Sequence, residues 1–264
     1  MKIASRNINW IRAIIQKWFF ERIHNNNFDI ICLQEVKAFE NQIPQEVRYH
    51  LSDYNIVWHI WDRPWYAGTA IFMKKNISLI EKKSEFSFPE FSKEWRVTEI
   101  SFKHNNNTIN LINVYFPNGW TRADWTEMLS YKLNFYEDIR KYIQELRNHW
   151  NQVICCWDFN ICHTEIDIAR PKENENSIWF LPIERKEMDK LCEDWLIDCF
   201  RSFNPWMIDQ YTRRSYRWRA RDNNIWRRLD YFWVSPELLN NISHIVHQTN
   251  ITWSDHCPIF IELQ

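Results

Sequence analysis

Three short segments place an acidic side chain and a second polar side chain at the end of an apolar run. Asp158 and Asn160 follow VICCW, and Glu35 follows IICLQ. Asp255 and His256 closely precede PIFI. Carboxylates are ligands that a hard divalent cation such as Mg²⁺ prefers, and a histidine beside them can act on a phosphate oxygen. If the three segments converge, they predict metal-assisted chemistry on a phosphate ester.

Each segment alone also has an ordinary structural interpretation. Asp158 and Asn160 are two residues apart and share one face of an extended segment, but Asx turns use the same residue types. Glu35 also fits a solvent-exposed strand end, and Asp255 with His256 fits a turn. The three segments together are more specific than any one of them.

Two other kinds of site are weaker alternatives. Cys156, Cys162 and His163 would offer zinc ligands, but the chain has no CxxC pair and their spacing is irregular. Ser254 as a nucleophile would lie only two residues from His256, which is poor geometry for a general base. The carboxylate-rich metal site is therefore the favoured hypothesis.

The elements that must position these residues alternate between strand-like and helix-like segments. Alternating or continuous apolar runs predict strands over residues 2–9, 28–36, 69–75, 97–103, 108–116, 152–160, 228–235 and 256–263. Helical spacing of apolar residues predicts helices over 11–25, 126–149 and 182–196. Polar residues, among them Asn7, Asn118 and Asp230, lie where strands end or begin, and side chains held there can face a shared cleft. The sequence thus indicates an α/β protein.

Composition bounds the remaining possibilities. The 264 residues contain no repeat or Pro/Gly/Ser-rich linker, so we expect a single domain over residues 1–264. No stretch approaches the ~20 uncharged apolar residues of a membrane helix, and the first residues lack a secretory signal, so the expected location is the cytoplasm. The chain has seven cysteines, which is an odd number, and several of them lie in apolar runs. We therefore expect them to be reduced. A net charge of −1 leaves DNA binding to local surfaces.

The order of motifs resembles the exonuclease III family of class II apurinic/apyrimidinic endonucleases, within the endonuclease/exonuclease/phosphatase superfamily. The motifs are LQEVK, AGTAIF, NVYFPNG, DFN, EIDIARPKEN, FLPIER, SYR, RLDYFWVS and SDHCPI, and they span essentially the whole chain. DFN and SDH also occur in the wider superfamily, whereas EIDIARPKEN, NVYFPNG and RLDYFWVS narrow the resemblance to the DNA-repair branch. The resemblance implies a DNase I-like, four-layered α/β sandwich with two packed mixed or antiparallel sheets flanked by helices.

The resemblance also implies residue roles. The implied metal environment, for Mg²⁺ with Mn²⁺ as an alternative, consists of Glu35, Asn7, Asp158, Asn160, Asp255 and His256, with Asn9 nearby. Asp158 would orient or deprotonate the attacking water, and Asn160 would hold the phosphate. His256, oriented by Asp230, would act on the phosphate.

Substrate contacts follow from the same resemblance. Tyr115 and Asn118 match residues that contact the phosphate or the leaving group. Arg12, Lys37 and Arg217 are expected to steer DNA locally. Arg213 and Arg227 stand where the family has aromatic residues around a pocket for a base-free sugar.

The implied activity is hydrolysis of the phosphodiester 5′ to an abasic site in base excision repair. The same site would give 3′-phosphodiesterase and 3′→5′ exodeoxyribonuclease activity. The implied partner is double-stranded DNA with abasic sites or 3′ blocks. The protein itself is expected to be a monomer. The alternatives are a superfamily phosphodiesterase or phosphatase with another substrate, and a catalytically impaired DNA-binding paralogue.

The chain departs from the family pattern in two systematic ways. Tryptophan stands at glycine positions, namely Trp10, Trp65, Trp95, Trp157, Trp179, Trp195, Trp226 and Trp253; arginine stands at tryptophan or other aromatic positions, namely Arg6, Arg213, Arg214 and Arg227. The chain has 2 glycines and 17 tryptophans, although glycine usually makes up ~7% of residues. Our hypothesis is that the gene was translated with the wrong codon table; a divergent paralogue is the alternative.

Overall fold

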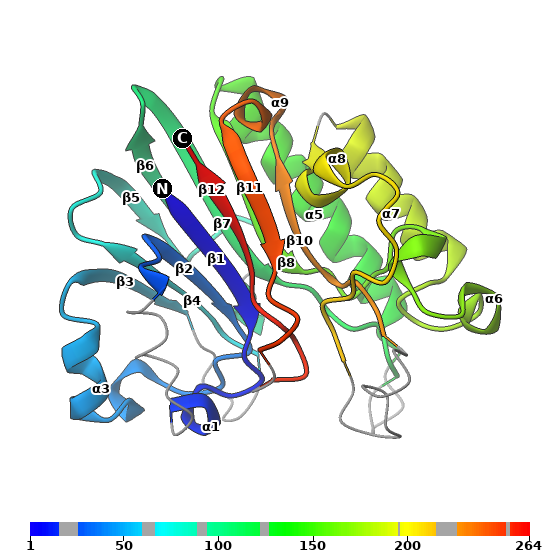
Figure 1. Ribbon diagram of the computed structural model, residues 1–264, viewed down its shortest axis with the longest axis horizontal. Helices are drawn as coiled ribbons and strands as arrows, with labels where there is room; N and C mark the ends of the chain where they lie inside the picture. The colour runs from blue at the N-terminus through cyan, green and yellow to red at the C-terminus, as the bar shows by residue number, and fades with distance from the viewer. Residues whose placement is uncertain are drawn as a thin grey trace.

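The computed structural model describes residues 1–15, 26–59, 67–88, 94–121, 127–194, 196–214, 226–251 and 254–264, apart from the side chains at positions 46, 47 and 157. Two six-stranded sheets form the centre of the molecule (Figure 1). All eight strands that the apolar patterns predict are present, with ends shifted by at most three residues.

The first sheet has the spatial order β11-β12-β1-β2-β4-β3. Its strands are β1 (Lys2–Asn7), β2 (Ile30–Gln34), β3 (Tyr54–His59), β4 (Thr69–Lys74), β11 (Ile242–His247) and β12 (Ile259–Leu263). β1 and β2 are parallel, while the other pairs are antiparallel. The parallel pair brings the carboxyl ends of β1 and β2 to the same edge.

The second sheet has the order β5-β6-β7-β8-β10-β9. Its strands are β5 (Leu79–Lys83), β6 (Val97–His104), β7 (Asn107–Tyr115), β8 (Gln152–Asp158), β9 (Ile197–Asp198) and β10 (Asp230–Val234). β7 and β8 are parallel, and the crossover between them contains the long helix α5 (Leu129–Asn148). A parallel connection requires such a crossover.

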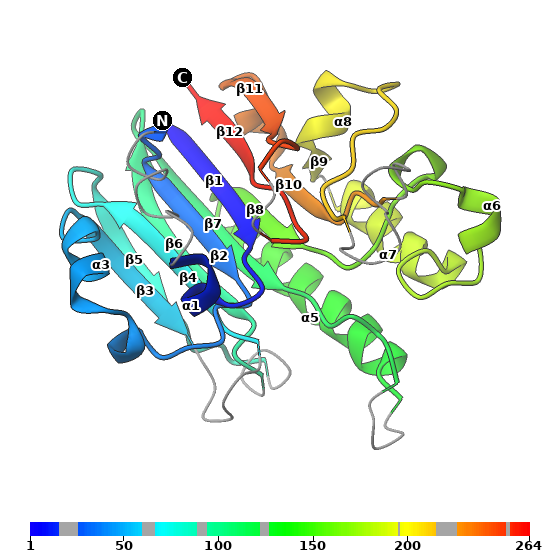
Figure 2. The same cartoon turned by 60° about the horizontal axis from the view of Figure 1, so that its bottom comes forward.

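The sheets pack face to face, and helices cover their outer faces (Figures 1 and 2). In β8, Ile154 and Cys156 belong to the core between the sheets, while Val153 and Cys155 belong to the core under the helices. Burial on both faces explains why VICC is apolar without alternation. The DNase I-like four-layered fold is confirmed.

Helices pack on both sheets. α5 and α7 (Pro182–Glu193) cover the second sheet, and α1 (Ile11–Ile15) packs with the first. Shorter helices are η1 (Glu40–Gln42), α3 (Gln45–His50), η2 (Glu165–Asp167), α6 (Pro171–Asn174), α8 (Cys199–Phe203) and α9 (Pro236–Leu239). All seven cysteines are free thiols.

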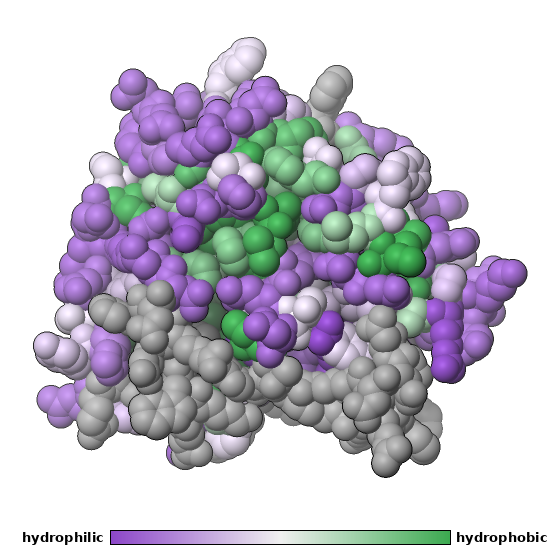
Figure 3. Space-filling model, in the orientation of Figure 1, coloured by the Kyte–Doolittle hydropathy of each residue, from purple (hydrophilic) through white to green (hydrophobic). Residues whose placement is uncertain are grey.

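The surface is mainly polar on the face drawn in Figure 3, where hydrophilic side chains surround separate hydrophobic patches. Within the described ranges, no helix combines the length and apolar character needed to cross a bilayer.

Candidate active site

A cluster of polar side chains joins the two sheets at one end. Asn7, the last residue of β1, donates from Nδ2 to Glu35 Oε1 (2.7 Å) and to Asp158 Oδ2 (2.8 Å). Glu35 follows β2 in the first sheet, whereas Asp158 ends β8 in the second. One amide therefore sets the distance between two carboxylates carried by different sheets.

His256 lies between two carboxylates of the second sheet. Asp230 begins β10 and is the register partner of Asp158 in β8. His256 Nδ1 is 2.8 Å from Asp230 Oδ2, and its Nε2 is 3.8 Å from Asp158 Oδ2. All three residues are buried. The bond to Asp230 orients the imidazole so that its Nε2 points toward Asp158.

The charges of this cluster are strongly coupled. Burial raises the pKa of Asp158 to about 6, with a further rise from the carboxylate of Asp230. Burial alone would lower the pKa of His256, but Asp230 and Asp158 outweigh it and raise that pKa to about 9. At neutral pH the imidazole is therefore a cation that can face an anionic substrate.

Two further carboxylates at this end have basic partners. Burial favours the protonated form of Glu35, but Lys37 Nζ, 2.5 Å from Glu35 Oε2, holds its pKa below the usual value. Burial acts likewise on Asp255, and there His256 and Arg213 hold the pKa low. Arg213 Nε donates to Asp255 Oδ2 at 3.3 Å. Both carboxylates are thus anions near neutral pH.

The backbone around the site is constrained. Glu35 (φ 55°) and Asn160 (φ 52°) both occupy the left-handed region, a conformation concentrated at functional sites. Asn160 donates from its amide N to Asp158 Oδ1 (3.0 Å) and from Nδ2 to the Phe116 carbonyl (3.0 Å). Ser254 Oγ donates to the Asn7 carbonyl (2.9 Å) and accepts from the His256 amide. Ser254 therefore holds the loop that carries His256.

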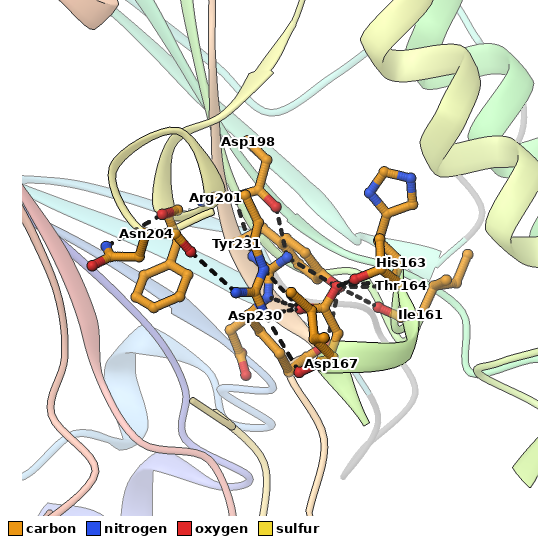
Figure 4. Close-up of polar contacts among 12 residues, drawn as sticks. Ile161, His163, Thr164, Asp167, Asp198, Arg201, Asn204, Asp230 and Tyr231 are labelled. Carbon is orange, nitrogen blue, oxygen red and sulfur yellow. Dashed lines mark hydrogen bonds and ion pairs between the residues drawn. The ribbon is translucent and has the colours of Figure 1, made fainter. Parts of the chain in front are cut away.

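A buried ionic network supports the site from behind. Asp167 accepts from the guanidinium groups of Arg228 and Arg201, and Asp198 accepts from Arg228 as well (Figure 4). Arg228 and Asp167 are fully buried. Next to this network, Thr212 Oγ1 accepts from the backbone amide of Asp230 (3.0 Å). These contacts fix the start of β10, where Asp230 lies.

The predicted substrate residues differ in exposure and in their partners. Tyr115, at the end of β7, is the register partner of Asp158 and lies under the Arg96 guanidinium. Asn118 and Arg12 are exposed. Lys37 is committed to Glu35 and to Asn9 Oδ1 (2.9 Å).

The two arginines at the expected sugar pocket are neighbours. Arg213 and Arg227 bridge through their backbones, and Arg213 also bridges to His256. The Arg227 guanidinium lies 3.7 Å from the ring centroid of Trp179. Burial and the nearby Arg213 charge lower the pKa of Arg227 to about 10. Arg217 lies outside the described residues.

The donor set fits a divalent cation. Within the described ranges, Asp158, Asp230 and His256 bring possible ligand atoms within 4.8 Å of one another. A protonated imidazole has no lone pair to offer, so the carboxylates are the donors of this group. Glu35 joins this group through Asn7. A cluster rich in carboxylate oxygens suits a hard cation, whose charge would oppose the burial and the Asp230 charge that raise the pKa of Asp158. The zinc alternative at Cys156, Cys162 and His163 is not among the groups found in this part of the chain.

Known sequences resemble this chain over almost its whole length. The sequence matches the Endonuclease/Exonuclease/phosphatase family over residues 7–256. The chain belongs to this family. An exodeoxyribonuclease of Bacillus subtilis is 33% identical over 260 residues, covering 98% of each chain. A DNA-(apurinic or apyrimidinic site) endonuclease of Dictyostelium discoideum is 32% identical over 266 residues. The aligned region covers 98% of this chain and 69% of the Dictyostelium protein.

Solved structures show the same fold. This family member superposes over its whole length on an AP endonuclease from Archaeoglobus fulgidus, of which 99% is covered, with a TM-score of 0.86 and 24% identity. A 3′ phosphatase from Neisseria, solved with product DNA hairpin, gives a TM-score of 0.86 at 22% identity, with 100% of this chain and 99% of that chain covered.

Sequence reasoning missed the residues that support the site. Thr212 gave no signal, because a lone threonine before a basic pair has many roles. Asp167 and Arg228 lie inside the motifs EIDIARPKEN and RLDYFWVS, and that position is the signal that could have found them. Lys132 had a clearer signal: it is spaced with Phe135, Tyr136 and Ile139 on the buried face of α5, where a lysine needs a partner.

Proposed function

We propose that this protein is a Mg²⁺-dependent DNA repair nuclease that hydrolyses the phosphodiester bond 5′ to an abasic site. The nuclease class rests on the family and on full-length relatives that are exodeoxyribonucleases and AP endonucleases. We extend the proposal to 3′-phosphodiesterase and 3′→5′ exonuclease activity at the same site, acting on 3′ blocks. We also propose one domain over residues 1–264 that acts as a cytoplasmic monomer.

The observation that carries this proposal is the pairing of a cationic imidazole with a buried carboxylate at the joint between the sheets. Asp158 is placed to take a proton from an attacking water, because its pKa of about 6 suits a base at neutral pH. His256 is placed to stabilise charge on a phosphate oxygen, and Asp230 keeps it protonated and oriented.

The remaining residues position the phosphate and the cation. The backbone amide of Asn160 lies beside Asp158. Tyr115 is the last residue of β7, and Asn118 lies just beyond that strand. Glu35, Asp158 and Asp255 would hold the divalent cation, with Asn7, Asn160 and His256 completing its surroundings. When bound, the cation would neutralise charge that develops on the phosphate.

Arg213 and Arg227 favour a second candidate, an impaired DNA-binding paralogue. Two guanidinium groups would replace the apolar walls that exclude a nucleotide still carrying its base. In that case the protein would bind DNA through these charges without discriminating the abasic sugar.

A cleavage assay separates the candidates. The substrate is a duplex with one tetrahydrofuran abasic mimic, compared with the intact duplex, each with Mg²⁺ or with a chelator. Mg²⁺-dependent cutting 5′ to the mimic alone supports the proposal. Equal cutting of both duplexes would point to a less specific phosphodiesterase, and binding without cutting would point to the impaired paralogue.

A further inference from the structure

A buried ion pair lies directly behind the residue proposed to hold the phosphate. Lys132 in α5 and Glu184 in α7 are both fully buried, and their charged groups are 2.5 Å apart. Lys132 Nζ also donates to the backbone carbonyl of Asn160 (2.8 Å). Burial lowers the pKa of Lys132, against the opposing effect of Glu184. An isolated pair of this kind is weak evidence for stability, so another role needs consideration.

The same pair touches the loop that carries Asn118. Gly119 has φ +80°, and a Cβ built on it would lie 3.1 Å from Lys132 Cδ and 3.7 Å from Glu184 Oε1. The Asn118 loop therefore rests on the aliphatic stem of Lys132. Glu184 Oε2 in turn accepts from the amide of Leu181, which fixes the start of α7.

We propose that Lys132 and Glu184 are positioning residues for the phosphate end of the site. This inference rests on the proposed function for its substrate, but its geometry is independent of it. Lys132 holds Asn160 through the carbonyl and supports the Asn118 loop from below. Glu184 holds the ammonium group in place. Loss of both charges should let the side chains of Asn160 and Asn118 move from their positions. A misplacement of about 1 Å can cost on the order of a hundredfold in rate.

The test uses the full chain with Lys132→Met combined with Glu184→Gln, because removing one charge alone would strand the other and could unfold the protein. We expect kcat on the abasic duplex to fall roughly ten- to a hundredfold, with little change in KM. Hydrogen exchange in the peptide covering residues 158–162 should rise. The control is Tyr142→Phe, which removes a buried hydrogen bond from α5 to Glu99, away from the site.

Tyr142→Phe should lower stability while kcat and exchange at 158–162 stay as in the wild type. Unchanged kcat in an active double variant, or unchanged exchange, would overturn the positioning role. A wild-type protein that cuts no abasic duplex would instead contradict the proposed function. Hydrogen exchange in the peptide 158–162 alone would then test the positioning role of Lys132 and Glu184.

A separate observation concerns tryptophans with unusual backbone conformations. Trp10 (φ 124°), Trp95 (φ 53°), Trp150 (φ 60°) and Trp179 (φ 81°) all have positive φ. These are four of the ten tryptophans whose backbone is described. Positive φ is a genuine outlier for a bulky residue and is the usual property of glycine.

Trp150 shows the requirement most clearly. It follows α5, where its amide donates to the Arg147 carbonyl (2.9 Å) and the amide of Asn151 donates to the Leu146 carbonyl (3.3 Å). This is the Schellman motif, whose left-handed residue is usually glycine. The Trp150 side chain is 93% exposed, so its burial offsets none of the strain.

We infer that the polypeptide made in the cell carries glycine at positions 10, 95, 150 and 179. The chain as written has only 2 glycines, and both have positive φ. Trp58 and Trp233 differ from the four: both lie inside strands with ordinary backbone, and Trp233 is fully buried. Trp226 and Trp157 also lack positive φ, so the backbone alone assigns nothing there.

Two measurements test this. In the gene, one codon should encode positions 10, 95, 150 and 179, and a different codon should encode Trp58 and Trp233; peptide mass spectrometry of the protein from its own cell should show glycine at the four. Tryptophan in any of these peptides would overturn the inference for that position. In the chain as written, Trp150→Gly should raise the folding equilibrium constant roughly three- to tenfold, and Trp206→Gly, at an 86% exposed residue without positive φ, should not.

Discussion

Asp158 and Asp230 face each other as register partners across the antiparallel pair β8 and β10. Two neighbouring carboxylates repel, and here His256 relieves that repulsion by approaching both of them. The two carboxylates keep the imidazole positively charged at the position proposed for the substrate phosphate.

Asp230→Asn should lower the pKa of His256 from about 9 toward its ordinary value, because the largest favourable charge is lost. NMR titration of the imidazole in chelator would measure this. The nuclease rate should fall roughly 10²- to 10⁴-fold with little change in DNA affinity. A variant that keeps the wild-type rate would show that the orientation of His256 is dispensable.

The raised pKa of His256 also predicts how stability depends on pH. The folded-state pKa of about 9 exceeds the usual 6.5, so this contribution is fully present below pH 6.5 and is lost as pH rises through 9. Urea unfolding of the metal-free protein at pH 6 and pH 9.5 would measure it. His256→Asn should flatten the difference, whereas a similar slope in both proteins would assign it to other groups.

If the carboxylate cluster holds Mg²⁺ as proposed, Mg²⁺ should stabilise the folded protein, because the site exists only in the folded state. We expect a rise in Tm with saturating Mg²⁺ and no rise for Glu35→Gln, along with a loss of activity at low Mg²⁺. Glu165→Gln, outside the cluster, is the control and should behave as the wild type. An equal Tm rise in the Glu35 variant would move the cation elsewhere.

Asp167→Asn should be the most destabilising of these changes, because it leaves Arg228 buried without its main partner; the expected cost is roughly 3–5 kcal/mol. Arg228 and Arg201 hold the pKa of Asp167 well below its usual value, although burial opposes them. The wild-type contribution is therefore present above pH ~4 and lost as pH falls further. Acid unfolding followed by circular dichroism should begin at a higher pH in the variant, and Asp194→Asn, at a less buried pair, should shift it less.

Arg213→Trp combined with Arg227→Trp should increase discrimination between the abasic mimic and an intact duplex. The change removes a desolvated cation and supplies an apolar wall. The ratio of kcat/KM for the two substrates measures the effect, and we expect a gain of at least tenfold at constant salt. Lys141→Trp on the exposed face of α5 is the control. No gain in the ratio would argue against a sugar pocket at these positions.

The sequence predicted the interior of the fold better than its margins. The strands missed by the apolar pattern are β3, β5, β9 and β11, and these are the outermost strands of the two sheets. Edge strands mix exposed, half-buried and buried positions, as in the pattern of β11, so their hydrophobic signal is weak. Central strands are buried on both faces and were found.

The same division holds for the site. Glu35, Asp158 and His256 could be singled out because a polar or charged residue bordering an apolar run needs an explanation. Their mutual distances were not predictable, since Asn7 and Asp158 are 151 residues apart and meet only when the sheets pack. The structure brings these residues together, but their roles remain predictions, as does that of Arg217, which lies outside the described residues.

The first and last strands lie next to each other, and the amino group of Met1 donates to the carbonyl of Leu263 (2.6 Å). Both chain ends therefore lie away from the carboxyl ends of β1 and β8, where Asn7 and Asp158 are (Figure 1). An affinity tag, a fluorophore or a surface tether attached at either end would leave the proposed active site unobstructed, which makes immobilised single-molecule cleavage measurements practical from both termini.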